Sequence, residues 1–283
     1  MNPTRTAIRV GVARGWIELR QLFTTGLDLI GQFLTPAIAL GVLYLLRDRD
    51  YAGSDLSVAE LALPGLIGSI IAFNGLYGTA NALVLDREDG TLLRAKAAPN
   101  GMISYFIGKI ITVAGSVCVQ VVVVLAVGMM IIGGFSLDGA GAWATFAWIV
   151  LLGLLATLPI GAILGSVLDE PRDTFLLTIP LMGLVAISGI FYPITAMPGW
   201  LQGLAQAFPT YWAGIGMRSA LLPDEAVAIE IGQSWRHLET AAVLGTWAVA
   251  GLLIAPMVLR RMARNESGSS MQTRREKAMQ RAF

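Results

Sequence analysis

The sequence has very few of the residues on which most enzyme chemistry depends. Its 283 residues include one cysteine, Cys118, and one histidine, His237. A single cysteine excludes a disulfide and a thiolate metal cluster within the chain, and a single histidine weakens most metal and catalytic-triad chemistry. No HExxH motif, Ser-His-Asp set or paired carboxylate at depth is present. We therefore expect no catalytic, cofactor-binding or metal-binding residues here.

Charge is also scarce, and apolar residues take its place. Charged residues make up 14% of the chain and hydrophobic residues 55%, with a mean hydropathy of +0.67. This composition argues against a soluble domain, and a net charge of +1 gives no nucleic-acid-binding profile. The 32 glycines and 12 prolines fit membrane helices, where both residues are tolerated. The sequence therefore predicts an integral membrane protein.

Intervals without Asp, Glu, Lys or Arg locate the membrane-spanning helices. A span needs about 20 mostly apolar residues, because about 30 Å of hydrocarbon is crossed at about 1.5 Å per residue. The intervals predict an all-α membrane protein with six transmembrane helices, at residues 27–46, 61–85, 103–132, 143–168, 174–192 and 238–259.

The distribution of basic residues predicts the orientation. With six spans and both termini in the cytoplasm, only Arg47, Arg49, Arg218 and Arg236 of the 20 basic residues lie outside. Cytoplasmic flanks carry the excess of Lys and Arg, so this arrangement is favoured, whereas a seventh span would move a basic tail outside. We expect a multi-pass protein of the plasma membrane, with residues 264–283 as a cytoplasmic tail.

Residues 1–25 are expected to form an amphipathic helix in the membrane interface. The arginines extend to Arg20 and no small-residue cleavage site follows, so the segment is unlike a cleavable signal. A cytosolic lead-in is the alternative. The helix would place Arg5, Arg9 and Arg20 opposite an apolar sector, formed by Ile8, Val12, Ile17, Leu19, Leu22 and Phe23.

The predicted spans contain almost no ionisable residues, which argues against transport driven by a proton or sodium gradient. They do contain amides and hydroxyls at spacings of three or four, so that each trio lies on one helical face: Asn74, Tyr77 and Asn81, then Thr112, Ser116 and Gln120. These faces would either bind helices together or line a translocation pathway. Gly161 and Gly165 form a GxxxG pair that permits close helix packing.

Two further segments suggest more than packing. Residues 86–99 are a short charged loop in which Thr91 would cap a helix of residues 92–98 that Pro99 ends. It is either an ordinary cytoplasmic loop or a docking segment. Residues 193–217 are apolar, repeatedly broken by Pro and Gly, and rich in Trp and Tyr. They predict short re-entrant helices at the extracellular face.

Both segments resemble motifs of the ABC-2 type transporter permeases. The stretch Asp-Arg-Glu-Asp-Gly-Thr-Leu, residues 86–92, followed by Pro99, resembles that family's E-R-E-x-G-T-L…P element. Residues 188–218 resemble its S-G-x-F-x-P…M-P-x-W-L…P-x-x-Y…R element. The resemblance covers nearly the whole chain and is closest to the daunorubicin-resistance branch.

The resemblance implies a permease subunit that exports a hydrophobic or amphipathic substrate. It would pair with a second copy, as a homodimer, and dock on two separate ATPase subunits, which bind ATP and Mg. Carried over by position, the ATPase-coupling residues would be Asp86, in place of the family's usual Glu, with Arg87, Glu88, Gly90, Thr91, Arg94 and Pro99. The extracellular gate would comprise Phe191, Tyr192, Pro193, Pro198, Trp200, Leu201 and Pro209.

Three other functions stay open at this point. A polysaccharide or lipid-linked glycan exporter would share the coupling logic and differ in its cavity: Trp and Tyr lining would favour sugars, whereas Val, Leu, Met and Phe would favour drugs or lipids. A non-pumping membrane scaffold or channel subunit would need no ATPase. A membrane enzyme is opposed by the missing catalytic residues. The chain itself has no GxxxxGK[ST] motif, which agrees with an ATPase on another polypeptide.

Overall fold

The computed structural model describes residues 3–51, 56–135, 137, 139–168, 170–189 and 194–265. These residues are almost entirely helical, with one isolated β-bridge between Asp50 and Ser57 and no strand among them. The prediction of an all-α membrane protein is confirmed. The α-helices are α1 (Pro3–Leu22), α2 (Gly26–Leu46), α3 (Val58–Phe73), α4 (Thr79–Glu88), α5 (Thr91–Ala97), α6 (Gly101–Ile131), α7 (Ala140–Val167), α8 (Thr174–Ile187), α9 (Gly199–Gln206), α10 (Pro209–Leu221) and α11 (His237–Asn265).

Five segments in the described part are long and apolar enough to cross a membrane: α2, the continuous helix 58–88, α6, α7 and α11. Each overlaps one predicted span. The remaining prediction, 174–192, corresponds to α8, which ends earlier. Its 14 residues extend about 21 Å, less than the hydrocarbon thickness. The helix ends because Gly189 adopts a φ of 67°.

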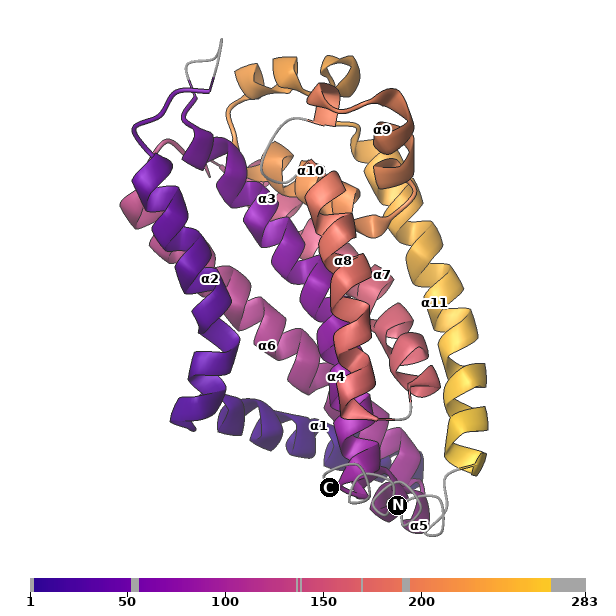
Figure 1. Cartoon of the computed structure of the whole chain (residues 1–283). Helices are drawn as coiled ribbons and strands as arrows, with labels where there is room; N and C mark the ends of the chain where they lie inside the picture. Colours follow the sequence, from indigo (N-terminus) through magenta and orange to yellow (C-terminus); the bar gives the residue numbers. More distant parts are fainter. Residues whose placement is uncertain are drawn as a thin grey trace, which may run out of the picture.

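The long helices stand side by side, and short elements cover their two ends (Figure 1). At one end, α1 lies across the upright helices and α5 lies nearby; we call this the α5 end. The end of α11 and the start of α2 lie there as well. At the opposite end lie α9 and the 3₁₀ elements η3 (Ile194–Ala196), η4 (Asp224–Ile229) and η5 (Ile231–Gln233).

The helix from 58 to 88 runs through the centre of the bundle and contains a π-helical segment, η1 (Asn74–Gly78). A capping box starts it: the Ser57 hydroxyl accepts from the Glu60 amide at 3.2 Å, and the Glu60 carboxylate accepts from the Ser57 amide at 2.6 Å. The π-segment widens one turn and often occurs at functional sites. It redirects the side chains of Asn74 and Tyr77 relative to a regular helix.

Helix α10 is buried almost completely between α3 and α7. The backbones of α10 and α3 approach closely at Gly214 and Gly68: a Cβ added to Gly68 would lie 2.7 Å from the Gly214 Cα. Pro209 occupies the first turn, where its missing N–H costs no hydrogen bond. The predicted region 193–217 therefore contains a surface helix, α9, and a helix packed in the core, α10, which extends to Leu221.

Helix α1 packs on the rest of the protein through small residues. Ala7, Gly11, Gly15 and Leu19, spaced four apart, are buried. A Cβ on Gly15 would lie 2.9 Å from the Gly108 Cα of α6. Close backbone approach selects small side chains, and of the predicted apolar sector only Leu19 is buried.

Ile8, Val12 and Ile17 of the predicted apolar sector are exposed, as they would be on a helix in the membrane interface, which stays a prediction. The prediction that Gly161 and Gly165 permit close helix packing is confirmed. A Cβ added to Gly165 of α7 would lie 2.7 Å from the Ala80 Cα. The cytoplasmic-tail prediction for 264–283 falls mostly on residues 266–283, which lie outside the described residues.

Candidate functional site

A cavity of about 970 Å³ opens among α1, α2, helix 58–88, α6 and α8. We call it the polar cavity, because amides, hydroxyls and charged groups share its wall with apolar side chains. All six residues that the sequence singled out on two helical faces line it: Asn74, Tyr77, Asn81, Thr112, Ser116 and Gln120. The two faces therefore meet at one space instead of packing on separate neighbours.

Several of these side chains also hold helices together. The Asn74 amide donates to the Gln120 carbonyl oxygen at 2.9 Å, and the Gln120 amide donates to the Gln32 backbone carbonyl at 3.0 Å and to the Gln32 side-chain oxygen. The Thr174 hydroxyl donates to Asn81 at 3.2 Å, which joins α8 to α4. Gln32 was missed from the sequence, although it is the one amide in the charge-free run of 29–46.

Tyr77 differs from its neighbours in the cavity. Its ring stacks on Phe73 with centroids 5.2 Å apart, and its hydroxyl makes no hydrogen bond within the described part of the chain. The Ser116 hydroxyl bonds only to a carbonyl of its own helix, Val113, at 2.9 Å. These two groups are therefore the wall positions best able to contact a bound molecule without breaking a contact between helices.

The end of the polar cavity nearest α5 is charged. The Lys109 ammonium lies 2.8 Å from an Asp86 carboxylate oxygen and 3.3 Å from one of Glu18. The Tyr105 hydroxyl donates to Asp86 at 2.6 Å. These contacts join three helices: Glu18 belongs to α1, Asp86 to α4, and Tyr105 and Lys109 to α6. The cluster was missed, since the three segments are distant in sequence.

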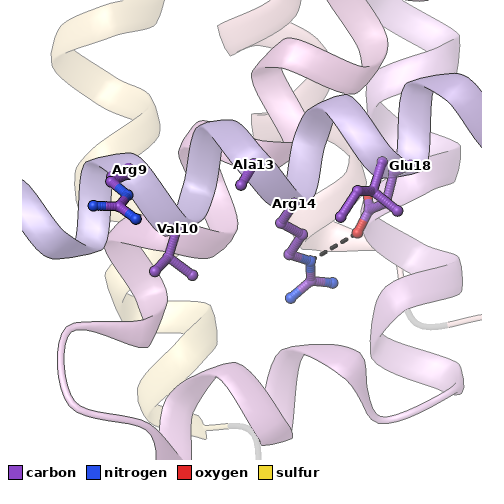
Figure 2. A pocket seen from close by; sticks show the side chains of 6 residues that line it. Arg9, Val10, Ala13, Arg14 and Glu18 are labelled. Atoms are coloured by element: carbon purple, nitrogen blue, oxygen red, sulfur yellow. Dashed lines mark hydrogen bonds and ion pairs between the residues drawn. The ribbon is translucent and has the colours of Figure 1, made fainter.

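Glu18 has a second partner on its own helix. The Arg14 guanidinium donates to it at 2.7 Å across one turn of α1 (Figure 2). Burial alone would raise the pKa of Glu18, but the hydrogen bond from Arg14 and the charge of Lys109 outweigh it, so that the pKa lies below its ordinary value. The carboxylate therefore stays ionised and keeps α1 tied to α6.

Helix α5 follows a tight turn at residues 89–90. Gly90 is the N-cap with a φ of 79°, which favours glycine, and the Thr91 amide donates to the Asp89 carboxylate at 2.8 Å. The prediction that Thr91 caps the helix was wrong: Thr91 is its first residue. The helix ends at Ala97 because Ala98 is extended, as the residue before a proline must be.

The predicted coupling residues divide into an inner and an outer group. Asp86 and Arg87 are buried, and the Arg87 guanidinium donates to the Leu168 carbonyl at 2.5 Å. Gly90 and Thr91 are buried too. Glu88, Arg94 and Pro99 are exposed at the α5 end. Only this outer group is able to contact another protein directly, whereas the inner group positions the turn and helix α5.

The predicted gate residues do not form one cluster in the described part. Trp200 is 71% exposed on α9 and Pro198 is exposed, whereas Leu201 is half-buried and Pro209 is buried at the start of α10. Phe191, Tyr192 and Pro193 lie outside the described residues. Trp200 is instead available to lipid or to another chain.

A buried ion pair lies beside these elements. The Arg218 Nε of α10 is 2.6 Å from a Glu230 carboxylate oxygen, and the two side chains are 3% and 1% exposed. The Arg218 Nη1 donates to the Gly189 carbonyl at 3.0 Å. This arginine therefore joins the end of α8 to α10 and η4. Glu230 was missed, because nothing in its local sequence distinguishes it from a surface acid.

These features define a multi-pass helical membrane protein with a polar cavity in its bundle and a short charged helix at one end. The family described as ABC-2 family transporter protein matches residues 29–255, and the chain belongs to that family. The resemblance seen in the two sequence motifs is thereby confirmed.

Two curated relatives are permeases by name. The probable multidrug ABC transporter permease YbhR of Escherichia coli K12 is 25% identical over 203 residues, which are 71% of this chain and 54% of YbhR. The chain therefore spans about half the length of that relative. The daunorubicin resistance ABC transporter permease protein DrrB1 of Streptomyces coeruleorubidus is 26% identical over 223 residues, 78% of each chain.

Proposed function

We propose that this chain is the membrane-spanning permease subunit of an ATP-binding cassette exporter. The polar cavity carries the proposal: it is a space within the bundle of about 970 Å³ whose wall reaches the charged cluster beside α5. Family membership and the permease names of both relatives support it. The substrate would enter this cavity and leave toward the opposite end of the bundle.

Energy would come from a separate ATPase subunit that binds ATP and Mg. Glu88 and Arg94 are exposed at the α5 end, on a segment anchored inside by Asp86 and Arg87. A movement of the docked ATPase would reach the cavity through Asp86, which is bonded to Lys109 and Tyr105 of α6. In this proposal the α5 end would face the cytoplasm, as would both termini.

Two permease copies with two ATPase subunits are the proposed assembly. Helix α2 buries only Pro36, Leu40 and Leu43 and exposes a long apolar surface that includes Leu34 and Ile38. That surface needs lipid or a second copy. Two ATPases would then meet two coupling helices.

The cavity wall supports a hydrophobic or amphipathic substrate, such as a drug, antibiotic or lipid. Besides its polar groups it contains Leu66, Ile70, Val113, Met182 and Phe175, and among the described wall residues there is one tyrosine and no tryptophan. A glycan exporter would favour aromatic platforms for sugars. The relatives' names, which mention multidrug transport and daunorubicin resistance, point the same way.

The first experiment asks whether the chain works with an ATPase. The chain would be co-expressed with the ATPase encoded beside it, purified through a tag on the permease and reconstituted in lipid. We expect the two to copurify and ATP hydrolysis to rise when a hydrophobic substrate is added. Absence of association with any ATPase would favour the scaffold or channel alternative.

Tyr77→Ala is expected to reduce export of a fluorescent hydrophobic dye about tenfold, the equivalent of about 1.4 kcal/mol of lost contact. The tyrosine lines the polar cavity, and its loss leaves no buried partner unsatisfied. Copurification with the ATPase should not change. Tyr44→Ala is the matched control, because Tyr44 lies on α2 away from the cavity wall and is exposed. Equal loss in both variants would contradict a cavity role.

A further inference from the structure

The outward face of α1 is basic. Helix α1 packs on α6 through Gly11 and Gly15, so its opposite face points away from the bundle. At 100° per residue, Arg5, Arg9, Trp16 and Arg20 lie within an arc of about 60° on that side. All four are exposed, and Trp16 is 64% exposed. We call these four residues the basic face of α1.

The positive charges of this face are not balanced within the described part of the chain. Glu18, the one carboxylate of α1, forms ion pairs with Arg14 at 2.7 Å and with Lys109 at 3.3 Å. Arg5, Arg9 and Arg20 form no ion pair with any described residue. Three guanidinium groups without an ion-pair partner in the described part therefore share one face of α1 with Trp16.

Apolar side chains border the arginines and leave a hollow beside them. The hollow measures about 560 Å³ and is lined by α1 alone, by Arg9, Val10, Ala13, Arg14, Ile17 and Glu18. Figure 2 shows Val10 and Arg14 extending from the same side of α1, with Arg9 drawn in front of the helix beside Val10. Val10 and Ile17 are more than half exposed. A guanidinium group next to exposed apolar side chains suits a molecule with an anionic head and an apolar chain.

The position of α1 matches the level of lipid head groups. It lies across the ends of the upright helices and leads into α2, which is long enough to cross the membrane, while α5 lies farther out at the same end (Figure 1). Tryptophan and arginine are enriched at this boundary, where a ring and a charged head are both accommodated.

We propose that the basic face of α1 and its hollow bind anionic phospholipid, with the phosphate group on Arg9 and its neighbours and an acyl chain along Val10 and Ile17. Zwitterionic lipids carry no net charge and gain little from three free guanidinium groups. Each basic residue near an anionic surface adds about a fivefold preference. The site would hold α1 in the interface and would not require an ATPase.

The test is a lipid titration of the purified full chain by native mass spectrometry. Phosphatidylglycerol and phosphatidylcholine with identical acyl chains are the two probes, and the ratio of their affinities is the readout. Arg9→Gln is expected to lower the preference for phosphatidylglycerol about fivefold, and the triple variant Arg5→Gln, Arg9→Gln, Arg20→Gln about a hundredfold. Arg9→Lys should keep the preference.

Arg49→Gln is the matched control, because Arg49 is exposed after the far end of α2 and should not affect the ratio. The three arginines have no ion-pair partner among the described residues, so unchanged thermal stability verifies that each variant is folded. An unchanged lipid ratio in the triple variant overturns the proposal. So does loss of ATPase copurification with the ratio intact, since the face would then bind protein.

Discussion

Reversing the charge of Glu88 or Arg94 is expected to uncouple ATP hydrolysis from export while the chain stays folded in the membrane. The Glu88 side chain is exposed and makes no hydrogen bond or ion pair in the described part of the chain. Arg94 makes one side-chain hydrogen bond, from its Nη2 to the Thr91 hydroxyl at 2.9 Å. Reversal therefore removes little from the permease itself. It places a like charge against any group that the native residue pairs with on an ATPase.

The expected effect is large. Truncating one partner of a buried charge pair at a protein interface costs about 2–5 kcal/mol, so a reversal should weaken docking at least 30-fold. The measurement is copurification of the ATPase with Glu88→Arg or Arg94→Glu, together with the rate of ATP hydrolysis and of dye export in lipid vesicles.

The control reverses an exposed charge at the opposite end of the bundle. Asp224→Lys changes the first residue of η4 and should leave docking and export unchanged. Normal export with Glu88→Arg and Arg94→Glu would remove α5 from the coupling path. If the Asp224→Lys control also lost export, the loss would reflect general damage to the permease and not a specific contact with the ATPase.

Arg218→Met is expected to lower the free energy of unfolding by about 3–5 kcal/mol, because it leaves the Glu230 carboxylate buried without its partner. The pair is almost inaccessible to water, at 3% and 1% exposure. The substitution also removes the hydrogen bond to the Gly189 carbonyl, which anchors the end of α8. Thermal unfolding of the purified protein in detergent measures the loss.

A second variant separates the charge effect from packing. Combining Arg218→Met with Glu230→Leu removes both charges and should recover most of the lost stability, because a buried pair replaced by apolar residues of similar size is often neutral. Arg172→Met is the matched control, since its ion pair with Glu170 leaves the Arg172 side chain 58% exposed. It should cost less than about 1 kcal/mol. Equal losses at Arg218 and Arg172 would contradict the buried-pair argument.

The helical class and the polar faces were predictable because both depend on local periodicity. A charge-free run long enough to cross the hydrocarbon predicts a helix wherever it occurs, and residues three or four apart share a face in any helix. Asn74, Tyr77 and Asn81 could therefore be grouped, as could Thr112, Ser116 and Gln120. That both groups meet at one cavity depends on how helix 58–88 and α6 face each other.

Helix ends were less predictable, because backbone conformation decides them. Thr91 has a good capping side chain, yet Gly90 takes the N-cap since the turn requires a positive φ. The sequence also did not indicate which side of α1 packs on the protein. Close approach to Gly108 selected Gly11 and Gly15 for that side, which left Ile8 and Val12 exposed.

The sequence by itself therefore determined an α-helical membrane chain, the family that its two motifs indicate and the polar helix faces. The tertiary structure decided which charges turn inward. Lys109 pairs with Asp86 and Glu18, and Arg218 pairs with Glu230, through contacts between separate helices and loops. Partners of this kind depend on three-dimensional packing, because burial makes an ion pair necessary and burial is a property of the whole fold.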